Sequence, residues 1–142
     1  MRRIIVATDG SLGANRAIDT AVTMAKASGY ELVILTIGGD MPGAELRRLA
    51  SAEGDLTKAL KAAADLILGR ARNRARRGGA SAVRTISGWG DAAEAIIDVV
   101  KREKADTLVV GRRGRSRLSR LLLGSVSQKL ANLAPCKIVI VP

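Results

Sequence analysis

The sequence predicts an α/β fold: a single-domain, open, five-stranded parallel sheet in the order 3-2-1-4-5, with helices on both faces. Two observations lead to this prediction. Five short apolar runs alternate along the 142 residues with longer segments whose apolar residues recur at helical spacing. The connections are mostly short, and no repeat or linker interrupts the alternation, so residues 1–142 are interpreted as one domain.

The first half of the chain is predicted to form two strands and two helices. Residues 3–8 and 31–37 are nearly continuous apolar runs, as expected for parallel strands buried on both faces. The helix between them should end at Gly29, a typical C-terminal cap. Residues 38–54 read as a loop with a short helical turn at 45–50. A long helix then runs to Gly78 and Gly79.

The third strand is predicted at residues 81–87, where Arg84 interrupts the apolar run. One residue facing solvent indicates a strand near a sheet edge. Gly88-Trp89-Gly90 predicts a turn, in which Trp89 is a partly buried or interface residue away from the ligand site. Asp91 and Glu94 resemble a capping box at the start of the next helix.

The fourth strand, residues 106–110, runs directly into a glycine loop. Gly111, Gly114, Gly124 and Ser125 follow the pattern G-x2-G-x9-G-S, after which a last helix and a fifth strand close the chain. Glycines let backbone amides approach an anion, and a helix start adds its unpaired amides and positive dipole end. The spacing differs from the Walker A and GxGxxG patterns. It predicts a phosphate-binding loop, although three turn glycines before a helix would also account for it.

The two polar motifs are expected to meet at one site. In open parallel sheets, ligands bind beyond the carboxyl ends of the strands where the winding direction reverses, here between the first and fourth strands. Asp9 follows one of these strands and Gly111 the other. The Asp9 carboxylate could accept hydrogen bonds from ribose hydroxyls or an adenine amino group. Alternatively, Asp9 and Ser11 only cap the first helix.

Composition excludes several kinds of chemistry. The chain has no histidine and one cysteine, which excludes Ser-His-Asp and Cys-His catalysis, histidine-bound zinc, an internal disulfide and a cysteine metal cluster. Cys136 is interpreted as a small buried filler. No apolar run is long enough to span a membrane, and no signal-peptide core is visible, so a cytoplasmic protein is expected.

The net charge is +11, and the positive charge is concentrated in two arginine clusters. Such charge attracts polyanions such as nucleotides, nucleic acid or an anionic membrane. For the cluster in the last turns of the long helix, a solvated face that complements the helix dipole is a sufficient explanation. The loop cluster comprises Arg112, Arg113, Arg115, Arg117 and Arg120, and the helix cluster comprises Arg70, Arg72, Arg74, Arg76 and Arg77.

Three motifs in the same order resemble the universal stress protein family, and its ATP-binding branch in particular. They are IVATDGS at 5–11, the glycine loop at 111–127, and APCKIVIV at 134–141. The resemblance implies a Rossmann-like, adenine nucleotide alpha hydrolase-like fold that binds ATP, with Mg²⁺ held through the phosphates. It also implies a homodimer that pairs the last strand, Lys137 to Val141, across a two-fold axis. An apolar sheet edge with little charge agrees with such pairing.

The resemblance assigns roles to individual positions. Residues near Ile37 would contact the adenine, and Asp9 would contact the ribose. The first two loop glycines would contact the ribose and a phosphate, and the start of the last helix would bind the remaining phosphates. Similar loops usually carry a small residue where this sequence has Arg112, which either clamps phosphate or faces solvent. Relatives often have a histidine where this sequence has Thr36. The expected nucleotide contacts are Ala7, Thr8, Asp9, Ile37, Val110, Gly111, Arg112, Arg113, Gly114, Arg115, Gly124, Ser125, Val126 and Ser127.

Three functions remain compatible with the sequence: a regulatory ATP-binding module, a basic adaptor for nucleic acid or anionic surfaces, and a slow ATPase or autokinase with Ser125 and Ser127 as acceptors. A phosphotransferase needs a group that orients the nucleophile, and no convincing base is present, so the binding module is favoured. Aromatic residues make up 1% of the chain, so nucleic-acid binding would be directed at the backbone and depend on salt.

Overall fold

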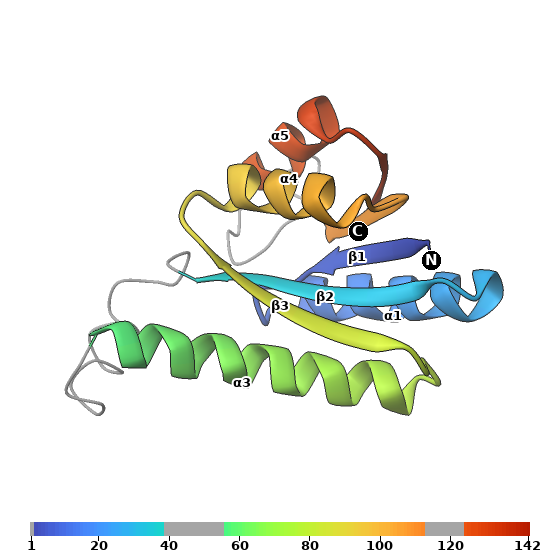
Figure 1. Ribbon diagram of the computed structural model, residues 1–142, viewed down its shortest axis with the longest axis horizontal. Helices are drawn as coiled ribbons and strands as arrows, with labels where there is room; N and C mark the ends of the chain where they lie inside the picture. The colour runs from blue at the N-terminus through green and yellow to red at the C-terminus, as the bar shows by residue number, and fades with distance from the viewer. Residues whose placement is uncertain (1, 39–55, 113–123) are drawn as a thin grey trace.

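The structure, a computed structural model, describes residues 2–38, 56–112 and 124–142. It contains one parallel sheet in the order β3-β2-β1-β4-β5, which confirms the predicted order. Helices α1 and α3 cover one face, and α4 and α5 cover the other (Figure 1). The helical turn predicted at 45–50 lies outside the described residues. The elements are β1 (Arg3–Ala7), α1 (Leu12–Ser28), β2 (Glu31–Gly38), α3 (Leu56–Arg77), β3 (Val83–Trp89), α4 (Ala92–Glu103), β4 (Thr107–Gly111), α5 (Ser125–Leu133) and β5 (Lys137–Val141).

The three central strands, β2, β1 and β4, are buried on both faces. Ile5, Val33 and Leu108 pack against the α4 and α5 side and are fully buried. Ile4 and Ile34 point the other way, into the core under α1 and α3, with 2% and 0% of their surface exposed. Burying one such side chain stabilises the fold by about 1.5–3 kcal/mol. This two-sided burial explains why these strands read as continuous apolar runs.

The helix ends follow the predicted capping residues. Ser11 caps α1 and accepts a hydrogen bond from the Ala14 backbone N–H at 3.1 Å. Gly29 ends α1 in the left-handed conformation, at φ 73°, and its N–H donates to Ala25. Asp91 caps α4 and accepts from the Glu94 N–H at 3.1 Å. The predicted caps are therefore confirmed where the residues are described.

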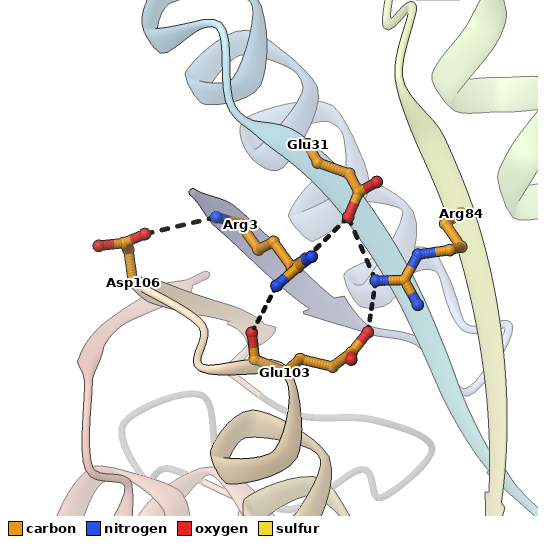
Figure 2. Close-up of polar contacts among 5 residues, drawn as sticks. All are labelled: Arg3, Glu31, Arg84, Glu103 and Asp106. Atoms are coloured by element: carbon orange, nitrogen blue, oxygen red, sulfur yellow. Dashed lines mark hydrogen bonds and ion pairs between the residues drawn. The ribbon is translucent and has the colours of Figure 1, made fainter. Parts of the chain in front are cut away.

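An ion-pair network joins the amino ends of the strands (Figure 2). The Glu31 carboxylate accepts from Arg3 at 3.0 Å and from Arg84 at 3.2 Å. Arg84 also pairs with Glu103, and Arg3 donates to the Glu103 backbone carbonyl at 3.0 Å. The Arg3 backbone N–H donates to Asp106 at 3.3 Å. The network thus links β1, β2 and β3 to the end of α4.

Arg84 corrects a sequence prediction. β3 is an edge strand as expected, but Arg84 does not simply face solvent, because its guanidinium bridges Glu31 and Glu103. The predicted turn at Gly88-Trp89-Gly90 is also wrong: β3 continues to Trp89, which pairs with Gly38 of β2. Pairing with β2 therefore overrides the glycine signal, and the chain turns at Gly90, where φ is 104°.

Replacing Glu31 by glutamine should destabilise the protein in a pH-dependent way. Partial burial raises the pKa of Glu31, but hydrogen bonds from Arg3 and Arg84 outweigh burial and hold the pKa below its ordinary value. A lowered carboxyl pKa stabilises the fold above the unfolded-state pKa, and that stabilisation is lost as pH falls through the folded-state pKa. We expect Glu31→Gln to cost about 1–2 kcal/mol at pH 7.

Urea denaturation at pH 7 and at pH 3.5 measures this effect. The difference between wild type and Glu31→Gln should shrink at the lower pH, because wild-type Glu31 is then increasingly protonated. Asp98→Asn, at an exposed position of α4, is the matched control and should change stability by less than about 0.5 kcal/mol. A Glu31→Gln effect that is independent of pH would contradict the role of the ion pairs.

Candidate functional site

The carboxyl end of β1 is held by three hydrogen bonds, two of which join it to β2. The Thr8 backbone N–H donates to Leu35 at 2.8 Å, and the Thr36 hydroxyl donates to the Thr8 carbonyl at 2.8 Å. The Thr8 hydroxyl accepts from the Gly10 N–H at 3.1 Å. Both threonines are buried. Thr36 therefore holds the backbone that leads into Asp9.

Asp9 shapes the turn between β1 and α1. Its Oδ1 accepts from the Ser11 backbone N–H at 2.9 Å, and Gly10 between them has φ 83°. The left-handed conformation at position 10 favours glycine. Asp9 and Ser11 thus contribute to the start of α1, as the capping interpretation expected. A carboxylate has about four acceptor positions, so this contact alone does not prevent Asp9 from binding a ligand.

Hydrogen bonds join the two ends of the glycine loop at Gly111, Arg112, Gly124 and Ser127, and we call this set of contacts the neck. The Gly124 N–H donates to the Arg112 carbonyl at 2.9 Å. The Ser127 hydroxyl lies 2.8 Å from the Gly111 carbonyl and 2.9 Å from the Arg112 carbonyl, so it donates to this pair. Arg112 in turn donates its N–H to Val141 of β5. The start of α5 is therefore fixed against the end of β4.

The register brings several predicted site residues to the carboxyl edge of the sheet. Ala7 pairs with Leu35 of β2, and Gly111 pairs with Val141 of β5. Ile37 lies two residues beyond Leu35 on the same strand, and Val110 directly precedes Gly111. The start of α5, Ser125 and Val126, is placed by the neck. Arg113, Gly114 and Arg115 lie outside the described residues, and their predicted contacts stay predictions.

Trp89 lies at this edge in β3, and not in a turn as the sequence predicted. A Cβ at Gly38 would fall 2.3 Å from the Trp89 ring, so the ring covers the end of β2. The indole remains 49% exposed. Trp89 therefore lies at the same edge as the predicted ligand site, on its outermost strand. The sequence feature that could have indicated this position is Gly38 at the end of β2, because a glycine there leaves room for a large side chain on β3.

The remaining chemistry of the described residues is limited. Within the described ranges, no three acidic or cysteine side chains are grouped so that they could hold a metal ion. None of the described helices is long and apolar enough to cross a membrane. Burial raises the pKa of the Cys136 thiol, which packs beside the core under α4 and α5. A thiol that stays protonated agrees with the predicted role of Cys136 as a filler.

Comparison with known proteins places this chain in a family. All of residues 1–142 match the model of the universal stress protein family. The chain belongs to this family. Universal stress protein YxiE of Bacillus subtilis is 32% identical over 98% of this chain and 97% of its own length. Universal stress protein Rv1636 of Mycobacterium tuberculosis is 32% identical over 99% of this chain and 95% of its own length.

Solved structures agree with the fold. A universal stress protein in complex with cAMP is 30% identical, with a TM-score of 0.72 and coverage of 99% of this chain and 96% of that one. UspA from Lactobacillus plantarum has a TM-score of 0.79 at 24% identity, covering 99% and 97% of the two chains, and shows the fold alone. The five-stranded parallel sheet is thus shared with universal stress protein structures.

Replacing Ser127 by alanine should destabilise the protein even without a ligand. The Ser127 side chain is 4% exposed, and its hydroxyl holds the Gly111 and Arg112 carbonyls. Losing this hydrogen bond should cost about 1 kcal/mol. Ser125→Ala, at an exposed position two residues earlier, should change stability by less than about 0.5 kcal/mol. Equal effects of the two substitutions in ligand-free thermal denaturation would refute the anchoring role of Ser127.

Proposed function

We propose that this protein is a cytoplasmic, homodimeric regulatory module that binds ATP, with Mg²⁺ held through the phosphates. The observation that carries this proposal is the closed neck of the glycine loop, which fixes the start of α5 beside the end of β4. The helix start contributes backbone N–H groups and the positive end of its dipole, and an anion is stabilised there.

In this proposal, the start of α5 binds the phosphates. Gly124 has no side chain, so a phosphate oxygen can approach the backbone at the N-cap position. Ser125 is exposed and can donate its hydroxyl, whereas Ser127 is buried and holds the neck. Val126 is half-buried against the core, which fixes the orientation of this first turn. Of residues 124–127, Gly124 and Ser125 would therefore contact phosphate directly, whereas Val126 and Ser127 would hold the first turn of α5 in position.

The other end of the nucleotide would lie against β1 and β2. In this proposal, Asp9 accepts hydrogen bonds from ribose hydroxyls, and Ala7, Thr8 and Ile37 lie beside the adenine. The relative bound to cAMP supports a ligand of the adenine nucleotide class. ATP is favoured over a cyclic monophosphate because the loop carries Arg112, Arg113 and Arg115. Guanidinium groups gain more from a triphosphate than from one phosphodiester charge.

Binding, rather than catalysis, is the proposed activity. The chain has no histidine to act as a general base. Asp9, the carboxylate expected at this site, would lie at the sugar end of the nucleotide, away from the transferable phosphate. Phosphoryl transfer requires a group that orients the nucleophile at the γ-phosphate. ATP hydrolysis or autophosphorylation is therefore proposed to be slow and secondary.

The homodimer is proposed to form through the free edge of β5. Lys137 donates its backbone N–H to Asp106, and Val141 accepts from Arg112, so these alternate residues face β4. Ile138 and Ile140 lie between them, and their N–H and C=O groups consequently point away from β4. Apart from Lys137, the β5 side chains are apolar and half-buried. Pairing with a second copy would satisfy this edge.

Calorimetric titration with ATP and Mg²⁺ tests the nucleotide site. Gly124 has φ −64°, so valine can adopt this backbone without strain while its side chain occupies the space expected for phosphate. We expect Gly124→Val to weaken ATP binding on the order of 100-fold, about 3 kcal/mol. ADP and cAMP titrated in parallel should bind more weakly than ATP.

Gly69→Val is the matched control for this titration. Gly69 lies in α3, where an added Cβ would meet no atom within 4 Å. This variant should bind ATP as wild type does at both 50 and 200 mM salt. If the two valine variants bind ATP equally, or if the wild-type signal disappears at the higher salt, ATP binding at the glycine loop is refuted.

Analytical ultracentrifugation tests the dimer. The wild type should sediment as a dimer, and Ile140→Pro should sediment as a monomer because proline removes an N–H from the free edge of β5. The β4 ladder keeps its hydrogen bonds, so circular dichroism should show that the variant stays folded. A wild-type monomer, or a folded Ile140→Pro variant that remains dimeric, would contradict the proposed β5 interface.

A further inference from the structure

A second charged surface lies at the opposite edge of the sheet from the candidate nucleotide site. The helices run antiparallel to the strands, so α1 and α3 both end at the amino edge of the sheet (Figure 1). The two helix ends are in contact, because Lys26 Nζ donates to the Gly78 carbonyl at 3.2 Å. We call Lys26, Arg70, Arg76 and Arg77 the basic end. All four of these residues are exposed.

Helix α3 supplies most of this charge. It carries seven basic residues and one acidic residue, Asp65, in a chain whose net charge is +11. The face of α3 that packs on the sheet is mainly alanine, with Ala63, Ala71 and Ala75 among its buried residues. Short side chains bring the helix backbone close to the sheet. Arg72 reaches Thr85 of β3 and Arg74 pairs with Asp19, whereas Arg70, Arg76 and Arg77 are exposed.

The nearby acidic groups are already paired with other arginines. Asp19 accepts from two nitrogens of Arg74, at 2.7 and 2.8 Å, and this hydrogen bonding holds the pKa of Asp19 below its ordinary value. Glu31 pairs with Arg3 and Arg84. Among the described residues, none of the ion pairs involves a member of the basic end. Its positive charge is therefore not neutralised within the described part of the chain.

The helix dipole explains only part of this arrangement. A cation in the last turn of a helix gains roughly 0.3–1 kcal/mol, and the effect fades within that turn. Arg76 and Arg77 lie in the last turn, but Arg70 lies about two turns from the end. Several guanidinium groups on one surface also repel one another. An anionic partner would remove this repulsion.

We propose that the basic end binds the sugar-phosphate backbone of duplex nucleic acid, independently of base sequence. Arg70 and Arg77 are separated by about 10 Å along the helix axis, at about 1.5 Å per residue. This separation equals the rise along the duplex axis of about three nucleotides of one strand, at about 3.4 Å each. Arginine also binds phosphate through two parallel hydrogen bonds. The chain has no phenylalanine, one tyrosine and one tryptophan, which disfavours stacking on unpaired bases.

Two observations favour duplex nucleic acid over a lipid membrane. Membrane surface binding uses large apolar side chains together with basic ones. Among the exposed large apolar side chains of the described residues, Leu12, Trp89 and Leu133 lie on other elements. Leu66 alone lies on α3, about one turn before Arg70, and a single leucine offers little apolar surface. The apolar residues of α3 that are buried face the sheet and cannot insert into a bilayer. The basic end therefore offers guanidinium and ammonium groups on a rigid helix.

Fluorescence anisotropy with a labelled 20-base-pair DNA duplex tests this proposal. The triple variant Arg70→Gln, Arg76→Gln, Arg77→Gln should bind at least about tenfold more weakly than wild type at 100 mM salt. The slope of log K against log salt should become shallower by about 2–3, since each phosphate contact contributes about 0.9. The matched control, Arg16→Gln, Lys61→Gln, Lys129→Gln, removes the same charge from other exposed positions and should stay within about threefold of wild type.

Equal weakening in both triple variants would overturn the proposal, because net charge alone would then explain binding. An unchanged salt slope in the basic-end variant would also overturn it. Vesicles of phosphatidylserine and phosphatidylcholine serve as the competing partner. Arginine-dependent binding to these vesicles without binding to the duplex would assign the surface to membranes instead. Gly124→Val should bind the duplex like wild type, which separates this surface from the nucleotide site.

Discussion

The burial of β2, β1 and β4 on both faces determines where polar groups can lie in this protein. Ile5 and Val33 occupy one face of these strands, and Ile4 and Ile34 the other, so neither face of the central sheet can accept an unpaired charge. Polar and charged residues are therefore confined to the two sheet edges and the outer helix faces. Parallel strands make these two edges different, because one collects all amino ends and the other all carboxyl ends.

The helix dipoles give the two edges opposite chemical preferences. Each helix begins at the carboxyl edge of the sheet, where α5 presents backbone N–H groups beside the glycine loop. Each helix ends at the amino edge, where Lys26, Arg77 and Arg102 lie in or near last turns. The shared direction of the helices therefore accounts for both the candidate anion site at the carboxyl edge and the basic surface at the amino edge. The Arg3, Glu31 and Arg84 ion pairs neutralise part of the amino edge, and the remaining excess lies on α3.

The sequence predicted the helix caps because those signals are local. It predicted the strand order because alternating strands and helices restrict a parallel sheet to a few topologies. Gly29 ends α1 and Asp91 starts α4 through contacts within a few residues. Arg84 was misinterpreted because its partners, Glu31 and Glu103, become neighbours only when β3 pairs with β2 and α4 packs above them. Trp89 was misplaced for a similar reason, since the space above Gly38 exists only in the paired sheet.

The sequence predicted which strand end and helix start meet at the glycine loop, but not all of the contacts between them. The Gly111 to Ser127 pattern correctly indicated that a strand end and a helix start meet at the loop. The pattern did not reveal that Ser127 turns its hydroxyl to the Gly111 and Arg112 carbonyls, because the contact depends on the folded path of the chain. Residues 113–115 lie outside the described part of the structure, so their predicted phosphate contacts rest on sequence.

Hydrogen exchange with and without ATP and Mg²⁺ tests the central claim most directly, because one experiment reports on both edges of the sheet. Bound nucleotide should slow amide exchange at residues 124–127 and near Asp9, and should leave residues 70–77 unchanged. That result would place the nucleotide at the glycine loop. Protection confined to residues 70–77, or no protection at either edge at saturating ATP, would contradict the account.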